Sequence, residues 1–351
     1  NNKHSNNTAH LTTLETMASS SQDADPSVDG FEMNESMEAL MDKYDGFILD
    51  QFGCIHDGTK GLPGAPECVK ALHNAGRKLA ILSNSSSSSE ACKSKLPKLG
   101  FNSQYFKAAV TSGQEAGIYV RETYGNDKKT NEGRGGPTKV LFLTWRTPKT
   151  PSPTTFLDLC GGKDVVEVTD KPPEAELILL HGVDVMRGPG NDGEATETSL
   201  GNIMEDGDLS TVETIIKECA ARNVPMICAN PDFIMVKPDG SIGHMPGKIA
   251  DLYMNMGGKC TSFGKPHVPH FEACVNALGL PKDKVAHVGD SLHHDVAGAN
   301  ASGIASVFVT GGIHREELGA ELGTLPDRES LEKLFKKHGQ TPTHVIPLVR
   351  I

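Results

Sequence analysis

An aspartate at the end of an apolar run is the first residue of this sequence that suggests chemistry. Phe, Ile and Leu occupy positions 47–49, and Asp50 follows them directly, ahead of Gln51, Phe52 and Gly53. A carboxylate at the carboxyl end of a buried strand lies where open α/β sheets bind their ligands. Asp50 is therefore a candidate nucleophile or metal ligand.

Polar residues of complementary type follow three other segments. They are Ser83 and Asn84 after residues 78–82, Lys265 after Ser262-Phe263-Gly264, and Asp290 after residues 285–289, with Asp295 in the segment that follows. Each group alone fits an ordinary turn, helix cap or solvated loop. In a doubly wound sheet, however, these positions meet at one crevice, so their joint occurrence favours a common site.

This set of side chains suits displacement at a phosphoryl group. Two carboxylates would bring Mg²⁺, which prefers oxygen ligands. The metal and a lysine would offset charge on the phosphoryl oxygens, while a hydroxyl and N–H groups would orient them. An aspartyl-phosphate intermediate would divide the reaction into two easier steps.

The elements that must position these residues alternate along the chain. Strands are predicted at 47–50, 78–83, 108–112, 140–145, 165–169, 177–181, 225–229, 285–290 and 305–310, and helices at 65–75, 114–124, 209–222, 248–256, 267–278 and 294–302. This rhythm predicts an α/β fold with a Rossmann-like, doubly wound parallel sheet. The glycine-rich segments 125–136 and 187–208 are predicted to be surface loops, and the serine run 85–89 a solvated loop or helix N-terminus.

Composition narrows the class of protein. The chain has 351 residues, of which 37% are hydrophobic and 23% charged, and this length favours two domains. A net charge of −11 argues against a nucleic-acid partner. No apolar run approaches the roughly 18 residues of a membrane span, so we expect no membrane partner. The eight cysteines contain no CxxC pair and suggest neither a zinc knuckle nor a disulfide framework. This pattern is typical of a protein from a reducing compartment.

The N-terminal segment has the composition of a disordered chain. Residues 1–36 are rich in Asn, Ser, Thr and Asp and are predicted to be disordered. We expect a cytoplasmic protein. Because the sequence begins at Asn1, organelle targeting stays open, although the early aspartates are unlike a transit peptide.

The ordered motifs resemble the haloacid dehalogenase-like (HAD) hydrolases, subfamily IIA, which include sugar-phosphate, nucleotide and 4-nitrophenyl phosphatases. The matching segments are FILDQFGCIHDG at 47–58, LPGA at 62–65, ILSN at 81–84, ICANPD at 227–232, GKPH at 264–267 and VGDSLHHDVAGAN at 288–300. The resemblance covers residues 44–312. It implies a phosphatase acting on a small phosphorylated metabolite.

The resemblance also implies a role for each matching residue. Asp50 would be the nucleophile and a Mg²⁺ ligand, Phe52 would offer its backbone carbonyl to the metal, and Asp290 would be a further ligand. Asp295 would support the metal through water or through Lys265.

Phosphate binding and the domain division follow from the same resemblance. Ser83 and the Asn84 amide would hold the phosphoryl group, and Lys265 would offset its charge. An α/β cap would be inserted at residues 113–261 into a core of residues 37–112 and 262–351. Asn230 and Asp232 would then face the substrate from the cap, or form a plain turn. A homodimer through the cap is compatible with this arrangement.

Phe52 departs from the pattern of the family. Phosphatases of this family usually have a second aspartate there as general acid and base, and losing such a group costs on the order of 10² to 10⁴ in rate. Three consequences stay open. The enzyme acts on good leaving groups, a neighbour such as His56 or Asp57 substitutes, or the site binds a phosphorylated ligand with little turnover. The segment His56-Asp57-Gly58 more simply indicates a turn.

Two functions are therefore weighed. The first is a Mg²⁺-dependent phosphohydrolase, and the alternative is a catalytically reduced, phosphate-ligand-binding protein on the same fold. A receiver-like signalling domain is disfavoured, because such a domain is shorter and has its acidic pair before the acceptor strand. His293 and His294 are expected to be an exposed loop pair and not a transition-metal site, because the oxygen ligands around them suit Mg²⁺.

Overall fold

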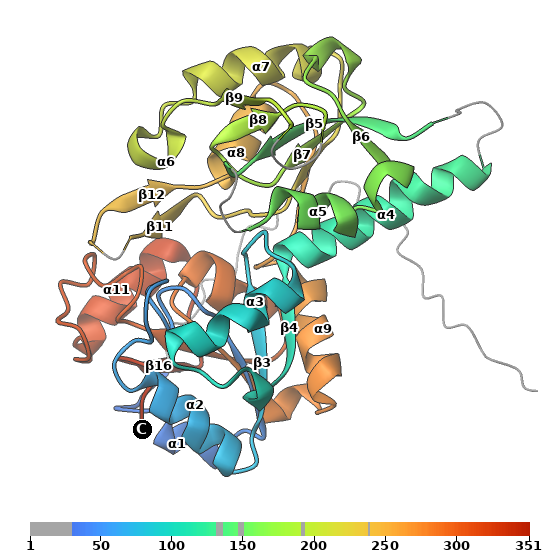
Figure 1. Cartoon of the computed structure of the whole chain (residues 1–351). Helices are drawn as coiled ribbons and strands as arrows, with labels where there is room; N and C mark the ends of the chain where they lie inside the picture. The colour runs from blue at the N-terminus through green and yellow to red at the C-terminus, as the bar shows by residue number, and fades with distance from the viewer. Residues whose placement is uncertain (1–29, 131–135, 147–150, 191–193, 238) are drawn as a thin grey trace, which may run out of the picture.

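The computed structural model describes residues 30–130, 136–146, 151–190, 194–237 and 239–351. Two sheets of seven strands each dominate this part of the chain, one above the other in Figure 1. Among the described residues, no helix combines the length and apolar character required to cross a bilayer.

The lower sheet, here called the core sheet, is entirely parallel. Its strands lie in the order β1 (Glu32–Met33), β16 (His344–Ile346), β15 (Ala305–Val309), β14 (Val285–Gly289), β2 (Gly46–Leu49), β3 (Lys78–Ser83) and β4 (Phe106–Thr111). After β1 at the edge, the chain enters the centre of the sheet at β2, moves to β3 and β4, and later returns to the other side of β2. The predicted doubly wound parallel sheet is confirmed.

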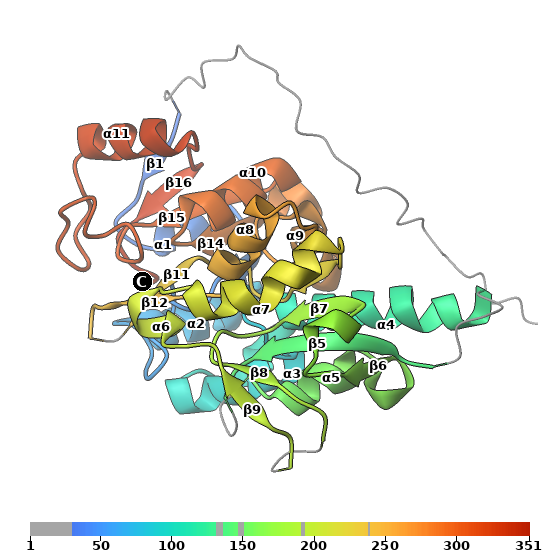
Figure 2. The same cartoon turned by 90° about the horizontal axis from the view of Figure 1, so that it is seen from above.

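Helices cover both faces of the core sheet. On one face lie α1 (Glu38–Met41), α2 (Ala65–Asn74) and α3 (Ser89–Lys95), whose apolar residues share a buried cluster with Phe47 and Leu49 of β2. On the other face lie α9 (Val268–Leu278), α10 (Ala297–Ser302) and α11 (Arg328–His338), which Figure 2 shows side by side. Because β2 is buried on both sides, its residues are uniformly apolar.

The upper sheet, here called the cap sheet, is mixed. Its order is β13 (Cys260–Ser262), β10 (Met226–Cys228), β7 (Leu177–Leu180), β5 (Thr138–Thr144), β8 (Val185–Arg187) and β9 (Glu197–Ser199), and β6 (Val166–Val168) also pairs with β5. The pairs β5–β8 and β8–β9 are antiparallel. A separate antiparallel hairpin, β11 (Ile234–Val236) and β12 (Ile242–His244), lies at the side that faces the core (Figure 1).

The cap sheet has its own two hydrophobic layers. On one face, α4 (Ser112–Thr130) and α5 (Pro153–Leu159) pack on Val140 and Phe142 of β5. On the other face, α7 (Ser210–Ala221) and α8 (Gly247–Asn255) pack on Leu141 and Leu143 of the same strand. Alternate residues of β5 thus face opposite layers, as the pleat of a strand requires. The short helix α6 (Ile203–Asp206) joins the second layer through buried Ile203.

Several predictions of irregular structure were wrong in part. Residues 32–33 form β1 beside β16, so the segment predicted to be disordered ends before them, because the edge of the core sheet supplies their hydrogen bonds. The predicted loop at 125–136 is helical as far as Thr130, and the predicted loop at 187–208 contains β9 and α6. Residues 1–29, 131–135 and 191–193 of these predictions lie outside the described residues.

The serine run 85–89 is a helix N-terminus, one of its two predicted forms. Ser88 is the N-cap of α3, and its hydroxyl accepts a hydrogen bond from the Ala91 N–H at 3.1 Å. The run is not solvated, however, since Ser86 and Ser87 are buried. Trp145, which follows β5 of the cap sheet, donates a hydrogen bond from its ring nitrogen to the Ser86 hydroxyl.

Candidate active site

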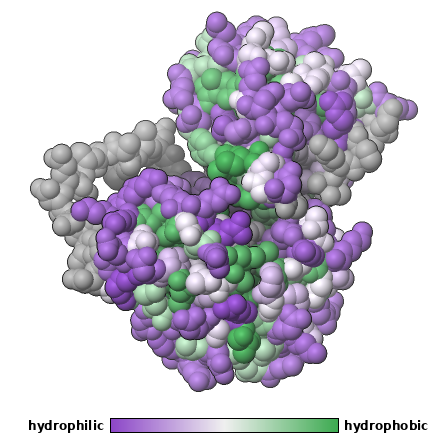
Figure 3. Space-filling view, turned by 90° about the vertical axis from the view of Figure 1, so that its left-hand side faces the viewer, coloured by the Kyte–Doolittle hydropathy of each residue, from purple (hydrophilic) through white to green (hydrophobic). Residues whose placement is uncertain are grey.

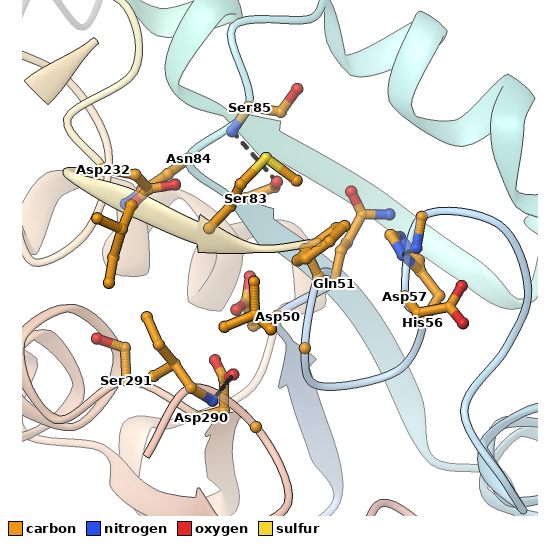
Figure 4. Close-up of a pocket in the computed structure, with 18 of the residues that line it drawn as sticks. Asp50, Gln51, His56, Asp57, Ser83, Asn84, Ser85, Asp232, Asp290 and Ser291 are labelled. Atoms are coloured by element: carbon orange, nitrogen blue, oxygen red, sulfur yellow. Dashed lines mark hydrogen bonds between the residues drawn. The ribbon is translucent and has the colours of Figure 1, made fainter. Parts of the chain in front are cut away.

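Three neighbouring strands of the core sheet end beside one another in a cleft. Asp50 follows β2, Ser83 ends β3, and Asp290 follows β14, on the other side of β2. Figure 4 shows Asp50 and Asp290 close together on one side of the pocket, with Ser83 and Asn84 across from them. The predicted convergence at the carboxyl edge of a parallel sheet is therefore observed.

Lys265 joins this strand edge to the loop after β14. Its Nζ lies 2.6 Å from Asp50 Oδ1 and 2.8 Å from Asp295 Oδ1, and its side chain is 3% exposed. Asp295 also lies 2.7 Å from His287 Nε2 and accepts the Ser291 N–H at 3.1 Å. Charge-assisted bonds of this length are strong and directional. They hold the ammonium group of Lys265 against Asp50.

Burial and charge shift the acidity of these groups in opposite directions. Burial raises the pKa of Asp50 to about 7, although Lys265 acts against this shift. Burial also raises the pKa of Asp290, and the neighbouring charges of Asp50 and Asp295 raise it further. The pKa of Asp295 is lowered, because Lys265 and His287 outweigh the effect of its burial. The site thus concentrates negative charge next to a single buried lysine.

Asp290 lies in a narrow backbone cradle. The Ile313 N–H donates to its Oδ2 at 2.8 Å. A Cβ atom placed on Gly53 would lie 2.4 Å from Asp290 Oδ2, and one placed on Gly312 would lie 2.0 Å from it. Only glycine leaves room for the carboxylate at these two positions. The loop at residues 311–313 was absent from the predicted site, although two consecutive glycines after a strand were a signal for it.

The carboxylates of Asp50, Asp290 and Asp295 form a compact group. One oxygen of each lies within 4.8 Å of the others. Their donors are all hard oxygens, which suit Mg²⁺ or Ca²⁺ better than softer transition metals. Repulsion between buried carboxylates is what a bound cation would relieve. Among the described residues, the donor set therefore fits a divalent metal of this kind.

Asn84 connects the core to the cap. Its Oδ1 accepts the Lys265 N–H at 2.7 Å, and its Nδ2 donates to Asp232 Oδ1 at 2.7 Å. The Ser83 hydroxyl accepts the Ser85 N–H at 3.3 Å and lines the same cleft. The side-chain amide of Asn84 is therefore engaged on both sides.

Asn230 and Asp232 lie on the cap side of the cleft. They form a turn, because the Asp232 N–H donates to Asn230 Oδ1 at 3.0 Å. Asp232 also contacts the core, where its Oδ1 lies 3.3 Å from His294 Nδ1. The structure thus unites the two predicted alternatives, a turn and a cap residue facing the site (Figure 4).

Phe52 lies in a tight turn that follows the strand. The Gln51 carbonyl accepts the N–H groups of Cys54, Ile55 and His56, which brings the Phe52 ring edge-on to His56 at 6.0 Å between centroids. The ring also packs against Gly58. The apolar ring of Phe52 therefore forms part of the cleft wall, and it can neither donate nor accept a proton.

The two neighbours considered as substitutes for an acid at Phe52 are held by their own turn. Asp57 Oδ1 accepts from the Thr59 N–H, the Thr59 hydroxyl and the Lys60 N–H, at 2.6 to 2.9 Å. His56 Nδ1 accepts the Gly58 N–H at 3.1 Å, and burial lowers the pKa of His56 to about 4. These contacts favour the interpretation of this segment as a turn.

His293 and His294 are not a simple loop pair. They lie in a π-helical turn, η6 (Leu292–Val296), that leads into α10. His294 is half-buried and contacts Asp232, while exposed His293 lies 3.2 Å from His338. The expectation of an exposed loop pair was wrong for His294, because the cap side of the cleft covers it.

The cleft between core and cap has a volume of about 1590 Å³. Its floor contains the carboxylates and Lys265, and its cap-side wall is formed by apolar residues from α6 and from around β11, namely Met204, Phe233, Ile234, Met235 and Val236. Figure 3 looks onto the side where α11 and the β11–β12 hairpin lie, and apolar side chains gather there between the upper and lower parts of the molecule.

Comparison with known families decides the identity of this fold. Residues 47–141 match the family described as haloacid dehalogenase-like hydrolase, and residues 262–346 match one described as HAD-hydrolase-like. The chain belongs to the haloacid dehalogenase-like hydrolases. The first matched segment contains Asp50, Ser83 and Asn84, and the second contains Lys265 and Asp290. In the sequence, most of the cap sheet lies between the two segments.

Other HAD hydrolases resemble the chain over most of its length. The sugar-phosphatase AraL of Bacillus subtilis is 23% identical over 273 residues, which are 77% of this chain and 85% of that protein. The 4-nitrophenylphosphatase of Schizosaccharomyces pombe is 25% identical over 310 residues, 84% of this chain and 94% of that protein. The predicted kinship with subfamily IIA phosphatases, and with it the prediction of an enzyme, is confirmed.

A solved structure supports the fold. The HAD-like hydrolase from Brucella suis 1330 superimposes with a TM-score of 0.64 at 21% identity, covering 90% of this chain and 99% of that one. The α/β architecture of this HAD hydrolase, with its parallel core sheet, is thus that of known members.

Proposed function

We propose that this HAD hydrolase is a Mg²⁺-dependent phosphatase that acts on a small phosphorylated metabolite through a phosphoaspartate on Asp50. The observation that carries the proposal is the contact of Lys265 with both Asp50 and Asp295, beside Asp290. A lysine and a carboxylate cluster around a strand-end aspartate suit attack on phosphorus.

The metal would be held by the side chains of Asp50 and Asp290 and by the backbone carbonyl of Phe52, with Asp295 supporting it through Lys265. When bound, Mg²⁺ would neutralise charge on the transferring phosphoryl oxygens. The glycine cradle around Asp290 supports this assignment, since it brings a buried carboxylate close to Asp50, with the Ile313 N–H as the donor to its Oδ2.

The protein's own groups divide the remaining work. One oxygen of Asp50 attacks phosphorus while the bond to the leaving oxygen breaks, and water later hydrolyses the acyl phosphate. Lys265 offsets charge on Asp50 and on the phosphoryl group. Ser83 and Asn84 lie across the pocket, where the Ser83 hydroxyl and the Asn84 backbone amide would orient the phosphoryl oxygens (Figure 4).

Phe52 would limit this enzyme. With no acid at this position, the leaving oxygen departs without a proton from the usual donor, so rates should depend steeply on leaving-group pKa. The turn contacts of Asp57 and the lowered pKa of His56 make neither a ready replacement. We therefore expect weak activity on alkyl phosphates and better activity on aryl phosphates.

The substrate class follows from the cleft and from the relatives. The names of the two relatives give phosphorylated small molecules, a sugar phosphate and 4-nitrophenyl phosphate, as their substrates. The cleft has an apolar cap-side wall above a polar floor. An organic phosphate with a partly apolar body would complement it, and the net charge of −11 disfavours nucleic acid.

A phosphate-ligand-binding protein with little turnover is the second candidate. Phe52 favours it, because the ring occupies the place of the usual acid and leaves the other ligand-holding groups intact. The two candidates differ only in turnover, since both need the same pocket.

Rates on a series of aryl phosphates of graded leaving-group pKa, with Mg²⁺, test the proposal. We expect a steep dependence, and loss of activity in Asp50→Asn. Fast turnover of alkyl phosphates with a flat series would contradict the role given to Phe52. Binding of a phosphorylated ligand without measurable turnover would favour the second candidate.

The domain division rests on the same proposal. We propose a core of residues 37–112 and 262–351 and a cap of residues 113–261, supported by the separate hydrophobic layers of the two sheets. The homodimer through the cap and the cytoplasmic location stay predictions.

A further inference from the structure

A second group of potential metal ligands lies at the rim of the cleft. His314 and Glu317 come from the loop after β15, and His338 is the last residue of α11, at the side of the molecule that Figure 1 labels α11. None of the three belongs to the proposed phosphoryl site. His314 and Glu317 line the cleft, so the group is within reach of solvent.

Two of the three spacings between the ligand atoms match a tetrahedral metal. Glu317 Oε2 lies 3.3 Å from His314 Nδ1 and 3.3 Å from His338 Nε2, and the three atoms lie within 4.8 Å of one another. Ligands at about 2.0 to 2.2 Å from a zinc ion in a tetrahedron are separated by about 3.3 to 3.6 Å. In the structure these two contacts are long hydrogen bonds between the rings and the carboxylate, which a bound metal would replace.

The charge states of His314 and Glu317 also suit coordination. Burial lowers the pKa of His314 to about 4, so its ring is neutral. The hydrogen bond from Lys337 lowers the pKa of Glu317 to about 2, so the carboxylate is ionised. Lys337 contacts Oε1, which leaves Oε2 facing the two histidines. Neutral imidazole and carboxylate are the forms that bind zinc.

The surroundings also supply outer contacts. His338 Nδ1 lies 3.2 Å from His293 Nε2, which would accept a hydrogen bond from the Nδ1–H while Nε2 of His338 binds the metal. The Leu292 N–H approaches His314 Nε2 at 3.4 Å. Coordination through Nδ1 would place the ring proton on that nitrogen, so this long contact must open when metal binds.

We propose that His314 Nδ1, Glu317 Oε2 and His338 Nε2 bind one Zn²⁺ ion, with water in the fourth position. Two borderline imidazole nitrogens with one carboxylate form a donor set that zinc binds, unlike the all-oxygen group around Asp50. The two sites should therefore sort metals, with Mg²⁺ at the carboxylates and Zn²⁺ at the histidines. This inference does not depend on the proposed phosphatase activity.

Zinc titration of the metal-free full chain, against a competing chromophoric chelator, tests the proposal. We expect one equivalent per chain. His314→Gln and His338→Gln should each weaken binding by more than the roughly 10- to 100-fold that loss of an outer-shell partner costs. Co²⁺ in place of zinc should give the intense visible spectrum of a tetrahedral ion in wild type and lose it in both variants.

Two control variants separate this site from others. Asp290→Asn removes a carboxylate of the phosphoryl site and should leave zinc stoichiometry unchanged. His73→Gln removes an exposed histidine that stacks on Tyr105, far from the cluster, and should also bind one equivalent.

Three results would overturn the inference. They are wild-type protein that binds no stoichiometric zinc, zinc binding that survives both histidine substitutions, and zinc binding that is lost in Asp290→Asn. Circular dichroism of the metal-free variants identifies any that fail to fold. His338→Gln, at the end of its helix, provides the decisive comparison if His314→Gln does not fold.

Discussion

Asp232, between two strands of the cap, accepts a hydrogen bond of 2.7 Å from the side chain of Asn84, at the end of a core strand. The same Asn84 accepts the Lys265 N–H. One amide thus ties the cap-side wall of the cleft to the lysine that contacts Asp50. The described chain closes over its site through this contact.

We expect Asp232 and Asn84 to be energetically coupled. Single and double alanine substitutions should give non-additive free energies of unfolding, with a coupling of about 0.5 to 3 kcal/mol, as is typical of contacting residues. Denaturant titration measures it. Asp232→Ala combined with Asn300→Ala, whose partners lie at Ser306 and Thr341, is the matched control and should be additive. Additive effects in both pairs would show that the Asp232–Asn84 contact is not maintained in solution.

Phe52→Asp should restore a proton donor to the cleft. We expect faster hydrolysis of poor leaving groups, by up to about 10²-fold, and a flatter dependence on leaving-group pKa. The Phe52→Asn side chain has nearly the same shape as that of Phe52→Asp but no ionisable group, so this variant should not reproduce the gain in rate. Equal rates for the two variants would mean that shape, and not proton transfer, limits the enzyme.

Gly312→Ala should displace Asp290. A Cβ at this position would meet Asp290 Cβ at 2.2 Å and Oδ2 at 2.0 Å, which no side-chain rotation relieves at the Cβ. Mg²⁺-dependent activity should fall at least 10-fold, with a higher Mg²⁺ concentration needed for half-activation. Gly125→Ala, within α4 of the cap and opposite a Val165 methyl at 3.3 Å, is the control and should keep wild-type activity.

Metal removal should abolish turnover reversibly. Chelation is expected to stop hydrolysis and added Mg²⁺ to restore it, because buried carboxylates lose the cation that offsets their charge. In Asp290→Asn, Mg²⁺ should fail to restore the rate at any accessible concentration, whereas Glu316→Gln, beside the histidine cluster, should recover fully. Full activity in the presence of chelator would exclude a metal requirement.

Acid should destabilise the protein in part through His181. Burial lowers the pKa of this histidine to about 3, and its Nδ1 lies 2.8 Å from the Thr144 hydroxyl. The unfolded state, with a pKa near 6.5, takes up the proton first, so the stability is present above that pH and is lost as pH falls. We expect roughly 1.5 kcal/mol of loss between pH 6.5 and 5.

The free energy of unfolding, measured across this pH range, tests the assignment. His181→Gln should have a smaller pH dependence than wild type, whatever its absolute stability. His73→Gln, which removes an exposed histidine, should keep the wild-type slope. An unchanged slope in His181→Gln would refute the role of its burial.

Sequence predicted the parts of this site that lie on regular elements. Asp50, Ser83 and Asp290 each follow or end a largely apolar strand, and the parallel sheet places such ends together whatever the loops do. Lys265 comes close to Asp50 because the chain returns to the same crevice after the cap sheet. Strand-end position was therefore a sufficient signal for these residues.

Contacts that depend on tertiary packing had no comparable signal. Ile313 contacts Asp290 through its backbone N–H, so the type of its side chain does not indicate the contact. His314 and His338 meet only because α11 packs beside the loop after β15. The three-residue strand β9 lies in the polar, glycine-rich segment 187–208, where pairing with β8, which itself pairs with β5, outweighs weak local propensity.

Two neighbouring residues of one loop serve different centres. The N–H of Ile313 is bonded to Asp290, and the imidazole of His314, one peptide unit further, belongs to the histidine cluster. Because these residues are consecutive, a displacement of the loop would shift both groups. An ion held at the rim of the cleft would therefore restrain the backbone donor to Asp290 at its floor.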